Sequence, residues 1–170
     1  MLTMPKYLIE TKRLGLRFLQ ESDINYLEAL ESDLEVKKYF PDGPRDRSTT
    51  EDMINRFISN HVNKGLPNFL IFDLESGEFI GRIGFGLTED NEIEVGYVLH
   101  KKFWGKGVAS EAVLAMLTYA KEHIKTDYII AYADVGNVGS TRVMEKCGME
   151  YYKTGMAKGI ECRFYRIKNS

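Results

Sequence analysis

Residues 93–111 read IEVGYVLHKKFWGKGVASE, and this segment decides the fold. Its first part, Ile93 to His100, is a mostly apolar run that predicts a strand. Two glycines, Gly105 and Gly107, then let the backbone turn sharply. From Ala109 onward, apolar residues recur at helical spacing. The segment therefore predicts a strand that leads through a glycine-rich turn into a helix.

A compact apolar run from Tyr128 to Ala133 follows that helix. A strand, a helix and a second strand in this order favour a parallel pair of strands. Upstream, residues 69–74 and 79–87 have strand-like patterns, and polar turns join them to each other and to residues 93–100. This spacing predicts an antiparallel meander, so the complete sheet is expected to be mixed.

Further elements are expected towards both ends of the chain. Residues 12–19 alternate as a half-buried strand, and Ser22-Asp23 offers the start of a short helix. The spacing of Ser48 and Glu51 predicts a capping box at the start of a second helix. A helix from about Ser140 to Lys146 and a strand through residues 160–167 complete the prediction.

The composition excludes several classes of protein. The chain has 170 residues, 44% hydrophobic and 28% charged, which suits one globular domain over residues 1–170. A formal net charge of -2 provides no broad positive field for nucleic acid. No apolar stretch approaches the roughly 20 residues that span a bilayer, and the N-terminus has no signal-type apolar core. We therefore expect a cytoplasmic protein without nucleic-acid or membrane partners.

The cysteines and histidines do not point to a metal centre. Cys147 and Cys162 are the two cysteines, and the three histidines are scattered along the chain. Neither set has the spacing of metal ligands or of a disulfide framework. We expect no metal.

The glycine-rich turn is built to hold an anion. Its successive N–H groups can converge at a helix N-terminus, where the helix dipole also favours negative charge. It is not a P-loop, because no GxxxxGK followed by Ser or Thr is present, and a dinucleotide motif would need glycine in place of Ser110. Taken alone, the turn predicts either a phosphate cradle or a plain connection between strand and helix.

Four further segments, in order along the chain, resemble the GNAT superfamily of N-acetyltransferases, and within it the RimJ/RimL branch that acetylates protein N-termini. The turn matches that superfamily's Q/R-x-x-G-x-G/A signature at Gly107 and Ala109, but Trp104 stands where the general signature has Gln or Arg. The other matching segments are TKRLGLRFLQESD at 11–23, IGRIG at 80–84, EVGYVL at 94–99, and NVGS at 137–140 with EKCGM at 145–149.

The resemblance implies an α/β GNAT fold, with a mixed, mostly antiparallel sheet of about seven strands and about four helices. The sheet would be splayed between its fourth and fifth strands, where acetyl-CoA is held as co-substrate. Lys102 and Lys106 would add charge near the phosphates or would simply be solvated. The residues implied in cofactor binding are Tyr97, Val98, Leu99, Trp104, Gly105, Lys106, Gly107, Val108, Ala109, Ser110, Asn137 and Ser140.

The implied reaction is direct attack of an amine on the thioester. Glu94 is the expected general base, acting through water, with Glu92 as a weaker alternative and a solvated carboxylate as the plain interpretation. Many relatives protonate the leaving thiolate with a tyrosine at the position of Met144, which cannot donate a proton. Ser140 is then the expected acid, unless its hydroxyl caps the helix. Cys147 is expected to be a buried apolar residue rather than a nucleophile.

The sequence says less about the acceptor. An acidic run on and after the first helix either attracts a basic partner or is a solvated face, and we favour the solvated face. Residues 39–41 border the acceptor channel in relatives, while Phe85 and Tyr165 either wall that channel or belong to the core. The acidic run consists of Glu28, Glu31, Asp33 and Glu35.

Three functions stay open. We favour acetyl transfer to the α-amine of a protein or peptide. The alternatives are acetyl transfer to a small amine, such as a polyamine or aminoglycoside, and a catalytically silent acyl-CoA-binding module. A monomer and a homodimer are both compatible with the sequence.

Overall fold

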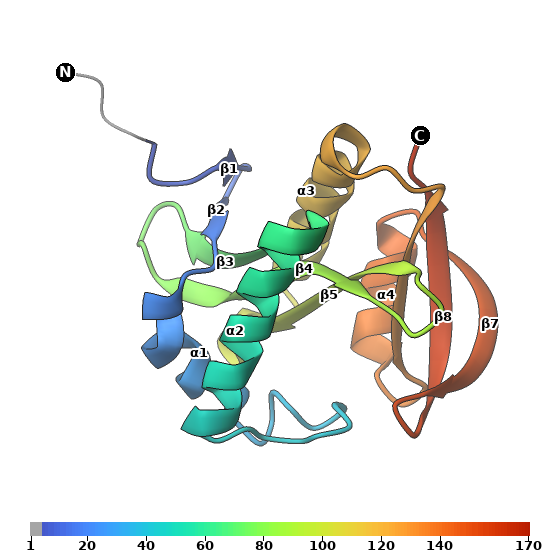
Figure 1. The fold of residues 1–170 in the computed structure, drawn as a ribbon, viewed down its shortest axis with the longest axis horizontal. Helices are drawn as coiled ribbons and strands as arrows, with labels where there is room; N and C mark the ends of the chain where they lie inside the picture. Colours follow the sequence, from blue (N-terminus) through green and yellow to red (C-terminus); the bar gives the residue numbers. More distant parts are fainter. Residues whose placement is uncertain (1–4) are drawn as a thin grey trace.

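The computed structural model describes residues 5–170 and shows one mixed sheet of eight strands with helices on both faces (Figure 1). The strand order across the sheet is β1-β2-β3-β4-β5-β6-β8-β7. The strands are β1 (Ile9–Glu10), β2 (Leu14–Phe18), β3 (Asn68–Asp73), β4 (Phe79–Leu87), β5 (Ile93–Leu99), β6 (Tyr128–Asp134), β7 (Glu150–Ala157) and β8 (Ile160–Lys168). The helices are α1 (Ile24–Glu31), α2 (Arg47–Lys64), α3 (Val108–His123) and α4 (Val138–Lys146), with short 3-10 turns η1 (Glu21–Asp23) and η2 (Lys101–Phe103).

The pairing of β5 with its two neighbours differs sharply. Against β4 it forms an antiparallel ladder along its whole length, from Gly81 opposite Leu99 to Leu87 opposite Ile93. Against β6 it runs parallel, and within the described chain the two strands share one registered pair, Glu94 with Ile130. The predicted meander and parallel pair are both confirmed. The sheet is splayed between β5 and β6, which are the fourth and fifth strands when the two-residue β1 is not counted.

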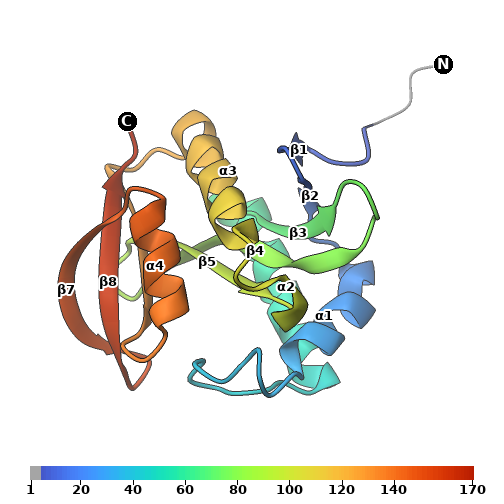
Figure 2. The ribbon, with the colours of Figure 1, turned by 180° about the vertical axis from the view of Figure 1, so that it is seen from behind.

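The two faces of the sheet are covered by different helices. Figure 1 shows α1 and α2 in front of the sheet, and Figure 2, from behind, shows α3 and α4 on the opposite face. The larger apolar cluster joins α3 and α4 to sheet residues such as Phe69 and Ile83. A second cluster joins α1 and α2 to Leu70 and Val98 on the other face. This division follows from strand alternation, because successive side chains point to opposite faces.

The sequence patterns missed two strands. β7 places most of its side chains in solvent, so it carries no apolar alternation, and β1 has two residues. β7 nevertheless forms because it pairs antiparallel with β8 as the edge of the sheet. The remaining predicted strands and helices are confirmed, with ends that differ by a few residues.

The predicted cap of the second helix is wrong. α2 begins at Arg47, and its N-cap is Asp46, whose side chain accepts a hydrogen bond of 2.8 Å from the Thr49 amide. Ser48 therefore lies inside the first helical turn. Aspartate caps at least as well as serine, and Asp46 holds the Thr49 hydroxyl at 2.7 Å as well.

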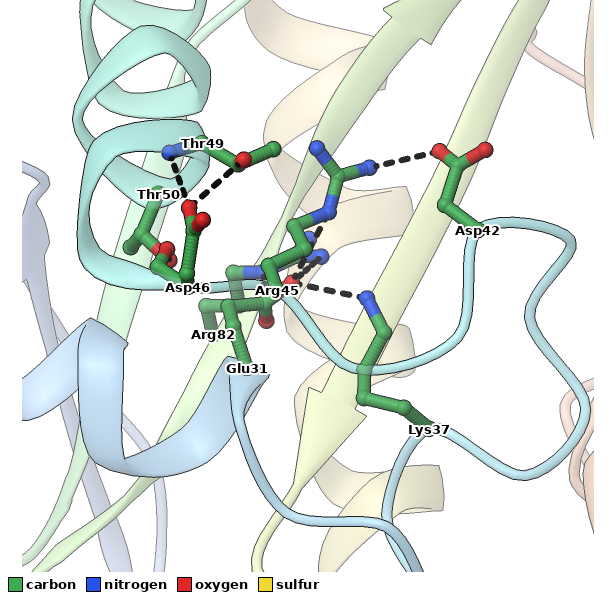
Figure 3. A network of polar contacts seen from close by, with 8 residues as sticks. All are labelled: Glu31, Lys37, Asp42, Arg45, Asp46, Thr49, Thr50 and Arg82. Carbon is green, nitrogen blue, oxygen red and sulfur yellow. Dashed lines mark hydrogen bonds and ion pairs between the residues drawn. The ribbon is translucent and has the colours of Figure 1, made fainter.

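One member of the acidic run, Glu31, is not solvated as expected but lies in a buried ion cluster (Figure 3). Its carboxylate is 0% exposed and accepts a hydrogen bond of 2.8 Å from the Lys37 ammonium, which is 1% exposed. Arg82 on β4 donates to the same carboxylate at 3.1 Å, and Arg45 approaches to 3.6 Å. The cluster therefore ties α1 and the loop that follows it to the central strand β4.

The charges around Glu31 control its protonation. Burial by itself would raise the pKa of Glu31, but the positive charges and hydrogen bonds of Arg82 and Lys37 outweigh burial and lower the pKa to about 2. The remaining three acidic residues lie nearer to solvent. Glu28 pairs with Arg47, Glu35 pairs with Lys101, and Asp33 accepts from the amide of Glu35.

We predict that Glu31→Gln lowers the free energy of unfolding by about 3 kcal/mol, because it leaves buried cations without a counter-charge. The matched control is Glu28→Gln, since the Glu28 side chain is 38% exposed and its ion pair with Arg47 is screened by water. A surface pair of this kind contributes at most about 1 kcal/mol. Urea unfolding of the two variants measures both values, and equal losses would contradict the cluster's role.

The same cluster predicts a pH dependence. The pKa of Glu31 falls from its ordinary value of 4.5 to about 2 on folding, so its contribution to stability is complete above pH 4.5 and is lost as the pH falls from 4.5 to about 2. The difference in unfolding free energy between the wild type and Glu31→Gln should shrink over that interval. A difference that stays constant with pH would show that Glu31 acts through packing and not through its charge.

Candidate functional site

A cavity of about 460 Å³ lies where β5 stops pairing with β6. Four segments line it: the end of β5, the turn into α3 with the first turn of that helix, one face of α4, and part of the loop after α1. Every residue that the sequence assigned to cofactor binding lines this cavity except Lys106. Tyr39 and Phe40 line it too, although the resemblance implied a place beside the acceptor channel for their loop.

The glycine-rich turn presents backbone donors to this cavity. Gly105 and Gly107 have φ values of 71° and 77°, a left-handed conformation that favours glycine. Gly107 is the N-cap of α3, and none of the described side chains caps that helix end. The first N–H groups of an α-helix lack a carbonyl partner within the helix. The amides that follow Gly107, those of Val108, Ala109 and Ser110, therefore remain free to bind an anion.

Two positive side chains stand beside this turn. A Cβ built on Gly107 would lie 3.5 Å from Arg13 Nη2 and 3.7 Å from Lys146 Nζ. Arg13 is held there by an ion pair of 2.7 Å with Glu111 and by a hydrogen bond of 2.9 Å to the carbonyl of Lys106. The fixed amides and the two charges together form a site of the right chemistry for the pyrophosphate of a nucleotide-type cofactor.

The two lysines that the sequence offered for this role, Lys102 and Lys106, do not line the cavity. Lys102 pairs with Glu78, and Lys106 contributes its backbone carbonyl to Arg13 rather than its side chain to the cavity. Arg142 and Lys146, which line the cavity, were missed although their spacing of four places them on one face of α4. The sequence around Arg13 could not indicate its place beside the turn, because Glu111, the residue that holds it there, lies 98 residues away.

The Ser140 hydroxyl is not the cap of α4. Asn137 is that cap, and its side-chain oxygen accepts a hydrogen bond of 3.2 Å from the Ser140 amide. The Ser140 hydroxyl instead lies 3.0 Å from the Tyr97 hydroxyl, and both residues line the cavity. Burial raises the pKa of Tyr97 to about 12. Met144 is buried in the apolar core, as its side-chain chemistry favours.

Glu94 lies on the other face of β5. Its neighbour Val95 belongs to the core under α3, so alternation places Glu94 with Val98 on the face of α1 and α2. It is half-buried and does not line the cavity. Gly96 lies between Glu94 and Val98 on this face. It is exposed, and a Cβ built there would meet no atom of residues 5–170 within 4 Å. The sheet surface beside Glu94 is therefore open.

The environment of Glu94 suits a base. Burial raises the pKa of its carboxyl, while the charge of Lys158, a hydrogen bond with Tyr132 and the charge of Arg82 oppose that rise. Opposite it on β4 stands Gly86, where a Cβ would come within 2.9 Å of the carboxylate. A glycine at that position therefore leaves room for the Glu94 side chain.

Four other candidate residues make contacts that hold the structure together. Phe85 and Tyr165 are buried in the core, and Tyr165 donates a hydrogen bond of 2.7 Å to Glu145, so neither walls an acceptor channel. Cys147 is buried and unpaired with Cys162, as expected. Trp104 lines the cavity and donates its indole N–H to the Leu99 carbonyl at 3.0 Å, which fixes the end of β5 against the turn.

Neither a metal centre nor a membrane-spanning helix is found within residues 5–170. Among these residues, no group of three His, Cys, Asp or Glu side chains is placed to hold a metal ion. None of the helices in the same range has the length and apolar character needed to cross a bilayer.

Comparisons with known proteins agree with this geometry. The family model described as an acetyltransferase (GNAT) domain matches residues 13–150. The uncharacterized N-acetyltransferase p20 of Bacillus licheniformis is 32% identical over 154 residues, which cover 89% of this chain and 85% of p20. An acetyltransferase of the GNAT family from Bacillus anthracis has a similar crystal structure, with a TM-score of 0.77, 30% identity, and coverage of 95% of this chain and 98% of that one.

Two more distant structures share the fold. One is an acetyltransferase from Salmonella typhimurium that modifies the N-terminal serine of ribosomal protein L7/L12, with 18% identity, a TM-score of 0.78, and coverage of 93% of this chain and 96% of that one. The other is a spermidine N-acetyltransferase from Vibrio cholerae, with 17% identity, a TM-score of 0.76, and coverage of 94% and 97%. Because the family model spans most of the chain, the protein belongs to the GNAT acetyltransferases and is an N-acetyltransferase that uses acetyl-CoA.

Proposed function

We propose that the protein transfers the acetyl group of acetyl-CoA to the α-amine of a protein or peptide, by direct attack in a ternary complex. One observation carries the proposal: β5 has a cofactor cavity at its end, with Tyr97 and Ser140 in its wall, and an open surface beside Glu94 on its opposite face. An amine and a thioester can then meet at one strand from two sides.

The free amides at the start of α3 bind the pyrophosphate of acetyl-CoA, with Arg13 and Lys146 supplying positive charge beside them. The backbone of residues 97–99 pairs with the pantetheine arm along the edge that β6 leaves free. A backbone N–H near Val98 meets the oxygen of the attacked carbonyl. These contacts place the thioester beside Ser140, at the splay of the sheet.

Two side chains serve the reaction. Glu94 accepts a proton from the amine through water, and burial makes its carboxylate a better base by raising its pKa. Ser140 serves the leaving thiolate, because its hydroxyl lies in the cavity wall whereas Met144 has no proton to give. Glu94 and Ser140 thus act on opposite sides of the bond that is exchanged.

An α-amine acceptor agrees with this machinery. Its ordinary pKa lies near 7.7 to 8.0, so one carboxylate acting through water is sufficient near neutral pH, whereas a lysine-like amine has a pKa near 10.4. The likeness in fold to the enzyme that modifies L7/L12 supports the same choice. The likeness to a spermidine enzyme makes a small amine the competing acceptor.

We predict that Gly107→Val weakens CoA binding at least about 10-fold, because a branched side chain disfavours the left-handed conformation that aims the α3 amides. Gly77→Val is the matched control. Gly77 has a φ of 76°, close to that of Gly107, but lies in the turn between β3 and β4 and does not line the cavity. Calorimetry that shows the same CoA affinity for both variants would overturn the assignment of the turn.

We predict that Glu94→Gln lowers kcat/KM about 100-fold at pH 7 and that the activity partly recovers above about pH 8, where an α-amine is already deprotonated. Glu92→Gln is the control, since Glu92 lies two residues before Glu94, outside β5, and carries the same charge. A loss that is uniform at every pH would assign Glu94 to acceptor binding. Equal pH profiles for the two variants would remove Glu94 as the base.

A panel of acceptors tests the proposed function directly. CoA release is measured with peptides that carry a free α-amine, with the same peptides acetylated at that amine, and with spermidine and an aminoglycoside. We expect turnover with the free peptides alone. Turnover with the small amines alone would assign the competing acceptor class. CoA binding without release for every amine would identify a silent acyl-CoA-binding module.

A further inference from the structure

Tyr97 contributes a side chain, as well as its backbone, to the cofactor cavity. Its hydroxyl lies 3.0 Å from the Ser140 hydroxyl, and this contact joins β5 to the first turn of α4 across 43 residues of sequence. Met144, one turn further along α4, has no hydroxyl, so Tyr97 and Ser140 are the residues of this contact that can offer a hydroxyl to the cavity. Within the cavity, Tyr97 is therefore the partner that fixes where Ser140 points.

The Ser140 hydroxyl has one proton to donate and can accept from other groups. In helices, serine and threonine hydroxyls often donate back to a carbonyl of the preceding turn. The neighbouring Thr141 does so, because its hydroxyl donates to the Val138 carbonyl at 3.1 Å. The Ser140 hydroxyl faces Tyr97 instead, so the contact between them holds Ser140 away from that alternative.

The direction of the hydrogen bond follows from acidity. A phenol is a much stronger acid than an aliphatic alcohol, so Tyr97 is the better donor and Ser140 the better acceptor. Burial raises the pKa of Tyr97 to about 12, which keeps the phenol protonated throughout the neutral range. When Tyr97 donates to Ser140, the single proton of Ser140 is left to point into the cavity.

We propose that Tyr97 is a positioning residue for the departure of the thiolate: its phenol donates to Ser140, and Ser140 thereby donates to the sulfur of CoA. The inference rests on the proposed function. As the C–S bond of the tetrahedral adduct breaks, its electron pair goes to sulfur, where the Ser140 hydrogen bond stabilises the negative charge. The proton that completes the thiol is one that the amine loses as the amide forms, so Tyr97 and Ser140 both stay neutral.

The first test needs no acceptor. The pKa of the thiol of bound CoA is measured by NMR titration, with carbon-13 placed next to the sulfur. A hydrogen bond to the thiolate should lower that pKa by about one unit relative to free CoA. Tyr97→Phe and Ser140→Ala should each reverse most of this shift, and the double variant should go no further than Ser140→Ala. A thiol pKa that is equal in the wild type and in Tyr97→Phe would overturn the proposal.

The matched control is Tyr165→Phe. It also removes a buried phenol oxygen, but that hydroxyl donates to Glu145 and does not line the cavity. We expect Tyr165→Phe to leave the thiol pKa and the turnover of the wild type unchanged. If it shifts the thiol pKa as much as Tyr97→Phe does, the effect comes from general repacking beneath α4, and the proposal fails.

Kinetics supply the second test. Tyr97→Phe should lower kcat about 10-fold, the size expected for one hydrogen bond, with little change in KM for acetyl-CoA. The losses of kcat in Tyr97→Phe and Ser140→Ala should not multiply in the double variant, because both substitutions remove the same hydrogen bond from Ser140 to sulfur. Multiplicative losses would mean that Tyr97 and Ser140 act independently, and would contradict the proposal. If the wild type acetylates no amine, the proposed function fails by itself, and the NMR titration still decides whether Tyr97 acts on sulfur through Ser140.

Discussion

The separation of β5 from β6 is the constraint on which the rest of the structure depends. β5 is fully paired with β4, but beyond Glu94 its other edge has no registered partner in the described sheet. Backbone N–H and C=O groups that leave a ladder must be satisfied in another way. Here they border a cavity beside the uncapped start of α3, so one break in the sheet creates both a slot for an extended chain and a cradle for an anion. Acetyl-CoA has a matching extended part, the pantetheine arm, and a matching anion, the pyrophosphate.

In the proposed reaction, the same break divides the chemistry between two faces of one strand. Alternation along β5 turns Tyr97 towards α4 and Glu94 towards α1 and α2, so in the proposed reaction the thiolate and the amine are served from opposite sides. One wall of the cofactor cavity is held in turn by the buried cluster around Glu31. Through Arg82 on β4, this cluster fixes the loop whose Tyr39 and Phe40 line the cavity. A surface ion pair could not hold that loop as firmly, because water would screen it.

Local patterns were enough to predict the strand, turn and helix around the site. Gly105 and Gly107 require conformations that side chains oppose, and the apolar spacing after them can only be helical. Contacts between distant segments could not be predicted in this way. Nothing near Arg13 in the sequence indicates that Glu111 will hold it beside the turn, and nothing near Glu31 indicates that Lys37 and Arg82 will bury it. The edge strand β7 could not be predicted for a different reason. Most of its side chains lie in solvent, so its sequence lacks the apolar alternation that marks a strand.

Amide hydrogen exchange with and without CoA tests the central claim most directly. If the break between β5 and β6 is the cofactor site, CoA will slow exchange at residues 97–99 and 108–110 and leave the fully paired β3 unchanged. Protection confined to other parts of the sheet, or an even slowing over the whole chain, would contradict the account. The first result would place CoA elsewhere, and the second would mean that CoA stabilises the fold without occupying the free backbone groups described above.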